Sequence, residues 1–163
     1  AGPMDSISSD IRTAFQYVPL DYEEVVTKEK LMPIAYGNTR PLNARWAKRM
    51  IEKIDAGIEL EKSYQYPVQA WKLGPELLFI GIGGEAVVDY SLRFKKEYDR
   101  QTTWVCGYAN EMAAYIPSRR VWEEGGYEGG NHLDEYGRPA WRWAGDVEER
   151  IGETVRKVVA KLE

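Results

Sequence analysis

The stretch Leu77-Leu-Phe-Ile-Gly-Ile-Gly-Gly-Glu85, continued by Ala86-Val-Val-Asp-Tyr90, decides how the rest of the chain is interpreted. A run of apolar residues stops at glycines, a carboxylate follows at once, and an amphipathic segment comes next. This order predicts a buried strand, a tight turn, and a helix with Glu85 in its first turn, where the helix dipole favours an ionised carboxylate. Ligand sites in α/β sheets form at such strand ends. Glu85 is therefore the first candidate for a functional residue.

Neighbouring segments extend this stretch into a mixed sheet. Residues 66–73 alternate apolar and polar side chains, which predicts a half-buried strand that forms a hairpin with residues 77–82, a strand buried on both faces. Residues 86–98 predict a helix and residues 102–108 the next strand. Strand–helix–strand units are right-handed and make their strands parallel. The predicted fold class is α/β, with a mixed sheet and a right-handed unit over residues 77–108. The apolar side of its helix would consist of Val87, Val88, Tyr90, Leu92 and Phe94.

The N-terminal part of the chain predicts a strand and two helices. The first strand covers residues 11–18 and ends at Pro19 and Asp21, and a short helix follows over residues 22–31, before a loop at Pro33.

The second helix has the clearest pattern of this half. Asn38 or Thr39 would cap it, Pro41 lies in its first turn, and Gly57 stops it. Its apolar stripe, at fourfold spacing, consists of Leu42, Trp46, Met50 and Ile54.

The C-terminal part divides into an irregular stretch and a closing helix. Residues 109–143 show no clear period and are rich in Gly, Tyr and Trp. Long irregular stretches in compact domains are usually functional or disordered, and the aromatic content argues against disorder. Asp146 and Glu149 predict a capping box that opens the C-terminal helix. The apolar face of that helix would be formed by Val147, Ile151, Val155, Val158 and Leu162.

Length and composition limit the classes of protein. The chain has 163 residues and a formal charge of −4, which suits one domain, or a fragment of one, over residues 1–163. No basic stripe suggests a nucleic-acid partner, and no run of about 18 apolar residues predicts a transmembrane segment. No signal peptide opens the sequence. Residues 1–5, which begin Ala1-Gly2-Pro3, are expected to be disordered or to come from an engineered start.

Taken one at a time, the candidate reactive residues have structural interpretations as well. The turn at Gly81, Gly83 and Gly84 lacks the spacing of a dinucleotide-binding motif and reads most simply as a tight connection. Glu85 alone is more often a helix-start carboxylate than a metal ligand. The single histidine, His132, is expected to be an exposed loop imidazole. The single cysteine excludes an internal disulfide. This residue, Cys106, lies in an apolar strand and is expected to be a buried, inert thiol.

Three motifs together resemble the neutral/alkaline ceramidase family, most closely its bacterial members. They are Gly83-Gly-Glu85-Ala-Val-Val-Asp-Tyr, then Gly107-Tyr-Ala-Asn110-Glu-Met-Ala-Ala-Tyr115-Ile-Pro-Ser118, then Gly125-Gly-Tyr127-Glu-Gly129. The resemblance covers roughly residues 66–163, and the motifs have the family's order and its offset between the two tyrosines. It implies the C-terminal part of a zinc-dependent catalytic domain that hydrolyses a lipid amide such as ceramide.

The resemblance also implies roles for individual residues. Glu85 and Tyr115 match two zinc ligands, Tyr127 matches a catalytic tyrosine that faces the substrate, and Asn110 matches a substrate-binding position. Zinc accepts such oxygen ligands together with histidines, and it activates water towards a carbonyl. The family's two histidine ligands come from an N-terminal part that this sequence lacks, and His132 matches neither. The chain alone is therefore expected to be inactive and to bind zinc weakly.

Alternatives from other classes stay open. The chain could be a non-catalytic α/β binding or scaffolding module, or a hydrolase of the same fold with another substrate. A partial domain is expected to expose apolar surface, through which it could form a homodimer. By resemblance, the parent protein is expected to be secreted or periplasmic.

Overall fold

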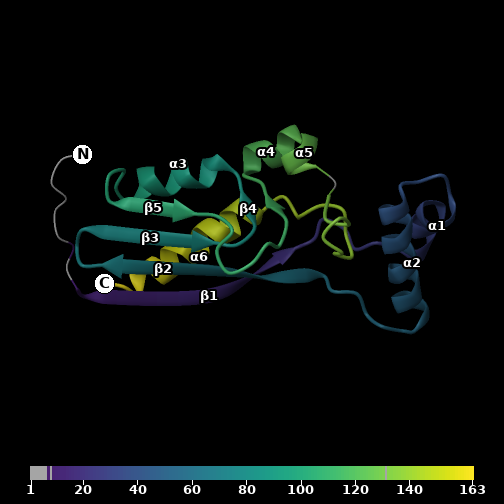
Figure 1. The fold of residues 1–163 in the computed structure, drawn as a ribbon, viewed down its shortest axis with the longest axis horizontal. Helices are drawn as coiled ribbons and strands as arrows, with labels where there is room; N and C mark the ends of the chain where they lie inside the picture. The colour runs from purple at the N-terminus through teal and green to yellow at the C-terminus, as the bar shows by residue number, and fades with distance from the viewer. Residues whose placement is uncertain (1–6, 8, 131) are drawn as a thin grey trace.

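A four-stranded mixed sheet forms the centre of the computed structural model, which describes residues 7, 9–130 and 132–163. Its order is β1-β2-β3-β5 (Figure 1). β1 (Ile11–Asp21), β2 (Ser63–Leu73) and β3 (Leu77–Ile82) pair antiparallel, and β3 pairs parallel with β5 (Thr103–Cys106). The predicted hairpin, the parallel pair and the α/β class are confirmed. The expectation for residues 1–5 lies outside the described residues.

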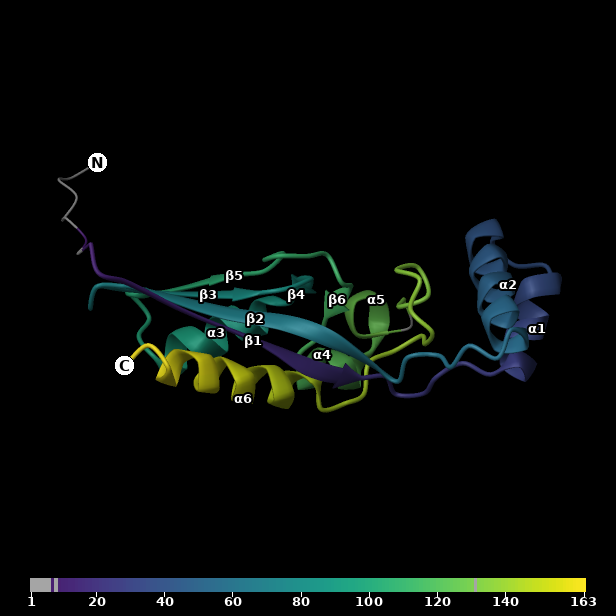
Figure 2. The same cartoon turned by 90° about the horizontal axis from the view of Figure 1, so that it is seen from below.

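Two helices cover one side of this sheet. α3 (Val88–Glu97) and α6 (Val147–Ala160) lie on the same side, and no described helix lies on the other (Figure 2). The predicted apolar face of α6 is buried throughout, together with Tyr90 and Phe94 of α3. Val88 and Leu92 were wrongly predicted to join them, because both point to solvent on the outer side of α3. Among the described residues, no helix is long and apolar enough to cross a membrane.

A helical pair forms a second, smaller core at one end of the molecule. α1 (Lys28–Tyr36) packs on α2 (Pro41–Asp55) around Leu31, Trp46 and Met50, and two extended connections join the pair to the sheet (Figure 1). The α2 prediction holds for the helix and for its buried residues Trp46 and Met50, with Gly57 in the left-handed conformation beyond its end. Leu42 was wrongly predicted to belong to the buried stripe, because it lies in the first turn and is 72% exposed. Neither Asn38 nor Thr39 caps α2, however, because Arg40 takes the capping position.

Pairing between distant segments overrides several local predictions. Residues 22–26 are extended rather than helical because Val25 pairs with Ala140 and the Val26 N–H donates to Pro139 O. α1 therefore starts later than predicted and contains Pro33. Pro19 does not end β1, since a proline without an N–H is tolerated on an edge strand.

Residues 109–143 contain more regular structure than predicted. β6 (Tyr115–Ile116) pairs parallel with β4 (Glu85–Ala86), and the short helices α4 (Arg119–Glu124) and α5 (Gly126–Gly129) follow. Ser118 caps α4 by accepting from the Val121 N–H. This stretch is thus built onto the end of the sheet.

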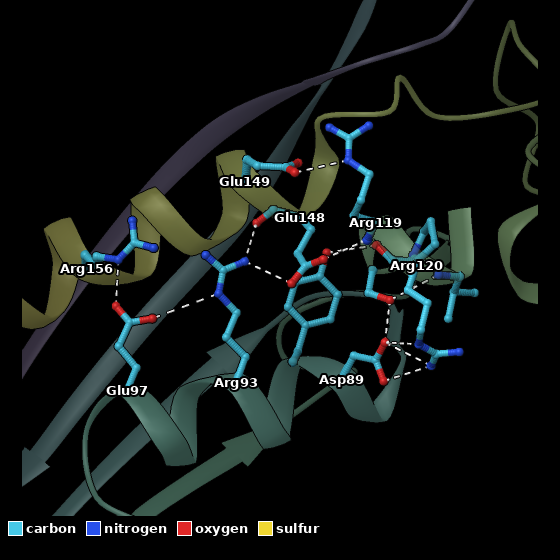
Figure 3. A network of polar contacts seen from close by, with 12 residues as sticks. Asp89, Arg93, Glu97, Arg119, Arg120, Glu148, Glu149 and Arg156 are labelled. Atoms are coloured by element: carbon cyan, nitrogen blue, oxygen red, sulfur yellow. Dashed lines mark hydrogen bonds and ion pairs between the residues drawn. The ribbon is translucent and has the colours of Figure 1, made fainter. Parts of the chain in front are cut away.

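Ion pairs tie α3, α4 and α6 together below the sheet (Figure 3). The half-buried Glu148 accepts from Arg93 Nη1 at 2.9 Å and from the Arg119 backbone N–H at 2.6 Å. Arg120 of α4 pairs with Asp89 of α3 at 3.0 Å. The Arg120 guanidinium and the Ser118 hydroxyl hold the pKa of Asp89 below its usual value. The predicted capping box is wrong, because the Asp146 carboxylate accepts from Arg150 and makes no capping hydrogen bond.

Candidate functional site

The glycine turn after β3 places Glu85 beside Tyr115. Gly84 has a φ of 63°, and a Cβ there would meet Ala114 O at 2.5 Å, so the turn requires glycine. The Glu85 N–H then donates to Ala114 O at 2.8 Å. Glu85 and Tyr115 are direct partners in the parallel β4–β6 ladder, so both side chains leave the same face. Glu85 therefore lies in a short strand and not in the first turn of the helix, which corrects that prediction.

Three buried aromatic side chains hold the backbone around this pair. The Tyr66 hydroxyl donates to Gly83 O at 2.6 Å, and the Tyr90 hydroxyl donates to Pro117 O at 3.0 Å. Trp143, 1% exposed, donates from Nε1 to Tyr115 O at 2.9 Å. Buried polar groups fix geometry when they are paired in this way. Neither Tyr66 nor Trp143 could be assigned this role from the sequence, since an aromatic residue in a strand or loop carries no sign of which carbonyl it will reach.

The second tyrosine of the predicted site also lies here. The rings of Tyr115 and Tyr127 meet edge to face with centroids 5.0 Å apart, and Tyr127 is 71% exposed. A hydrogen bond between the two phenols, then partial burial and the Glu85 carboxylate, raise the pKa of Tyr115 well above its ordinary value. The structure thus brings the Glu85 carboxylate and the phenol rings of Tyr115 and Tyr127 together. Their roles stay a prediction.

Two further phenols belong to the cluster, and neither was predicted from the sequence. Tyr108, directly beyond β5, makes a hydrogen bond with Glu85 that raises the pKa of the phenol. Burial and the charge of Glu85 raise the pKa of Tyr136. Tyr108 could have been found, because parallel strands β3 and β5 end at the same edge of the sheet. Tyr136 could not, since it lies in a loop without a period.

His132 packs behind Tyr115 instead of facing solvent. Its side chain is 5% exposed, so the prediction of an exposed imidazole is wrong. The ring meets that of Tyr115 edge to face at 5.3 Å, and Nδ1 lies 2.9 Å from Gly130 O, so Nδ1 carries the proton. Nε2 is buried and has no hydrogen-bond partner among the described residues. Burial lowers the pKa of His132.

Asn110 and Cys106 lie apart from these contacts. Asn110 is exposed with a φ of 71°, a conformation that asparagine adopts more readily than most residues. Within the described part of the chain, no hydrogen bond joins its side chain to Glu85, Tyr115 or Tyr127. Cys106 is exposed, which corrects the expectation of a buried thiol, because its side of β5 is not covered by a helix.

As a zinc site, the cluster is half complete. The Glu85 carboxylate and the Tyr115 phenol offer two oxygen donors on adjacent strands. Structural and catalytic zinc sites use three or four protein ligands. The described residues contain no group of three or more His, Cys, Asp or Glu side chains placed to hold an ion. The two donors fit half of a zinc site, and the remaining ligands would have to come from elsewhere.

Comparisons with known proteins bear on the fold. No family model matches this sequence, and no curated protein matches it. One similar solved structure is that of a ceramidase complexed with C2, with a TM-score of 0.55 and 12% sequence identity. The match covers 96% of this chain and 30% of that chain. This chain therefore has a ceramidase-like fold and spans less than a third of the neighbour.

Proposed function

We propose that this chain supplies part of the active site of a zinc-dependent amide hydrolase of the ceramidase type. The observation that carries the proposal is the pairing of Glu85 with Tyr115, with Tyr127 in ring contact, on a ceramidase-like fold. A polypeptide segment before residue 1 would complete the site with two histidines. The substrate class would be a lipid amide such as ceramide, and the parent protein would be secreted or periplasmic.

Each residue of the cluster has a distinct task in this proposal. Glu85 and Tyr115 would bind the zinc ion, which supplies a water of lowered pKa as nucleophile. The exposed Tyr127 would donate its O–H to the oxygen that becomes negative at the scissile carbonyl. Asn110 would contact the substrate from the turn after β5. Trp143 and His132 would hold the Tyr115 backbone and ring in place, since both contact that residue.

The test uses the natural chain extended upstream of residue 1 and a fluorescent N-acylsphingosine. Glu85→Ala should abolish zinc-dependent hydrolysis, because a missing ligand empties the site. Glu128→Ala, which removes an exposed carboxylate next to Tyr127, should leave the rate unchanged. Undiminished hydrolysis by the Glu85 variant would refute the assignment of Glu85 as a zinc ligand.

The isolated chain gives a second, independent measurement. Two ligands should bind zinc weakly, so calorimetric titration of the 163-residue chain should show no binding in the submicromolar range. Tight binding by the isolated chain would contradict the need for outside ligands.

A further inference from the structure

A cavity of about 450 Å³ lies between α2 and the loop around Asp134, and no residue of the Glu85 cluster lines it. Three arginines from α2 and its capping position do line it, namely Arg40, Arg45 and Arg49, and it is hereafter the arginine cavity. Arg45 and Arg49 are one helical turn apart, so their side chains are neighbours on one side of α2. The volume falls within the roughly 300 to 1,000 Å³ that is usual for small-molecule pockets.

The three guanidinium groups have no anionic partner in the described part of the chain. None lies within 4.0 Å of a carboxylate oxygen or makes a hydrogen bond there. Arginines elsewhere are commonly paired, as Arg120 is with Asp89. Like charges one turn apart repel each other and destabilise a helix. An anion held between Arg45 and Arg49 would remove this repulsion and give both groups a partner.

Two carboxylates also line the cavity, and neither neutralises the arginines. Asp134 is 7% exposed and accepts a hydrogen bond from Asn43 Nδ2 at 2.6 Å. Glu135 is exposed, and among the described residues no ion pair joins it to an arginine. With both carboxylates ionised, three positive charges still face two negative ones. The cavity is therefore positive in a chain whose formal charge is −4.

The lining fits a phosphate group better than it fits a carboxylate. A guanidinium presents a planar fork of N–H donors that matches phosphate oxygens, and such charge-assisted pairs are strong. A carboxylate carries one charge, which a single arginine satisfies, whereas a phosphate monoester carries close to two charges and three terminal oxygens. The exposed Leu42 and the buried Trp46 add apolar surface to the wall, which suits an uncharged body attached to the phosphate.

We propose that the arginine cavity binds the phosphate group of a phosphate monoester. Such a group occurs on free metabolites and on the headgroup of a lipid, and the cavity would recognise the chemistry that the two share. The phosphate would lie between Arg45 and Arg49, with the body of the ester against Leu42. This proposal does not rest on the proposed function, because the cavity shares no residue with the Glu85 cluster.

The test titrates the 163-residue chain with glycerol 3-phosphate and follows the arginine Nε–H signals by nitrogen-15 NMR. The Arg45 and Arg49 signals should shift and saturate. Arg45→Ala should weaken binding at least about tenfold, because it removes a charge-assisted pair, and Arg45→Lys should weaken it less, since it keeps the charge without the fork. Arg100→Ala removes the same charge from an exposed turn outside the cavity and should leave the affinity unchanged. Equal weakening by Arg45→Ala and Arg100→Ala would overturn the proposal.

Further probes identify the anion and its source. Glycerate, which offers a carboxylate instead of a phosphate, should bind several-fold more weakly, and equal affinity would contradict the phosphate assignment. Vesicle binding that needs phosphatidic acid and is lost in Arg45→Ala would identify a lipid headgroup, whereas binding of the soluble ester alone would identify a free metabolite. Absence of saturable binding to both probes would overturn the proposal. None of these measurements involves zinc or hydrolysis, so their failure would leave the proposed function standing.

Discussion

The two faces of one sheet differ in the kind of residue they carry and in what covers them. On the covered face, Val68, Ala70 and Ile80 are 0% exposed beneath α3 and α6. On the opposite face, here called the open face, Phe15, Tyr17, Trp71 and Trp104 of the same sheet are each about half exposed. The covered face stabilises this chain by burial, whereas the open face contributes little until something packs on it. The difference teaches that an apolar strand face does not by itself define a core; the helices that cover it do.

A matched pair of phenylalanines gives the largest expected contrast between the faces. Phe94 of α3 is 0% exposed beneath the sheet, and Phe15 is 47% exposed on the open face. Phe94→Ala should lower the free energy of unfolding by about 3 to 5 kcal/mol, because it leaves a cavity in a packed core. Phe15→Ala should cost about 0.5 kcal/mol in the isolated chain. Urea unfolding of both variants measures the difference, and equal costs would show that the open face is already packed.

The ion pairs below the covered face give the next effect. Glu148 bridges α3, α4 and α6, and Glu148→Gln should cost about 1 to 2 kcal/mol, because it weakens half-buried, charge-assisted hydrogen bonds. Glu153→Gln on the same helix is the control, since its pair with Lys157 is exposed to solvent and should contribute little to stability. Urea midpoints in low and high salt distinguish the two, and an equal loss in both variants would contradict the bridging role.

The pH dependence of stability tests whether burial keeps the His132 imidazole neutral in the folded chain. Burial lowers the pKa of His132 below 6.5, so above pH 6.5 the imidazole is neutral in both folded and unfolded chains and its contribution to stability is complete. As the pH falls through 6.5, the unfolded chain binds a proton that the folded chain does not, and stability falls. His132→Gln should flatten this part of the stability profile, because the chain has no other histidine. An unchanged slope between pH 7 and 5 would show that the imidazole is not held neutral.

Most of the sheet and the closing helix could be predicted from the sequence, because their apolar periods agree with their environments. The failures came from contacts between distant segments. Residues 22–26 look helical alone but pair with residues 139–143. Residues 77–82 read as buried on both faces, whereas Phe79 is only half buried, because no local pattern reveals whether a second layer is present.

Three residues of the candidate site, Glu85, Tyr115 and Tyr127, could be predicted from the sequence. The burial of the residues around them could not. The glycine turn indicated Glu85, and the family resemblance indicated Tyr115 and Tyr127. The pairing of β4 with β6 places Glu85 and Tyr115 side by side. His132 was wrongly predicted to be exposed, because it is buried by ring contacts with Tyr115 and Tyr136 that exist only in the folded chain. Cys106 was wrongly predicted to be buried. Its apolar strand sequence suggested that other residues pack over it, whereas no described helix covers its side of β5.

The smallest expected effect concerns the phenols beyond the end of β3. Tyr127→Phe removes the hydroxyl that raises the pKa of Tyr115 most, so that pKa should fall towards its ordinary value of 10.0 while the fold stays intact. Carbon-13 NMR of the tyrosine Cζ atoms follows the titration directly. Tyr17→Phe on the open face is the control and should leave the Tyr115 titration unchanged, because its ring contacts Phe15. If Tyr115 titrated identically in all three proteins, the two phenols would not share a hydrogen bond, and Tyr127 would have no fixed position from which to meet a substrate beside Glu85.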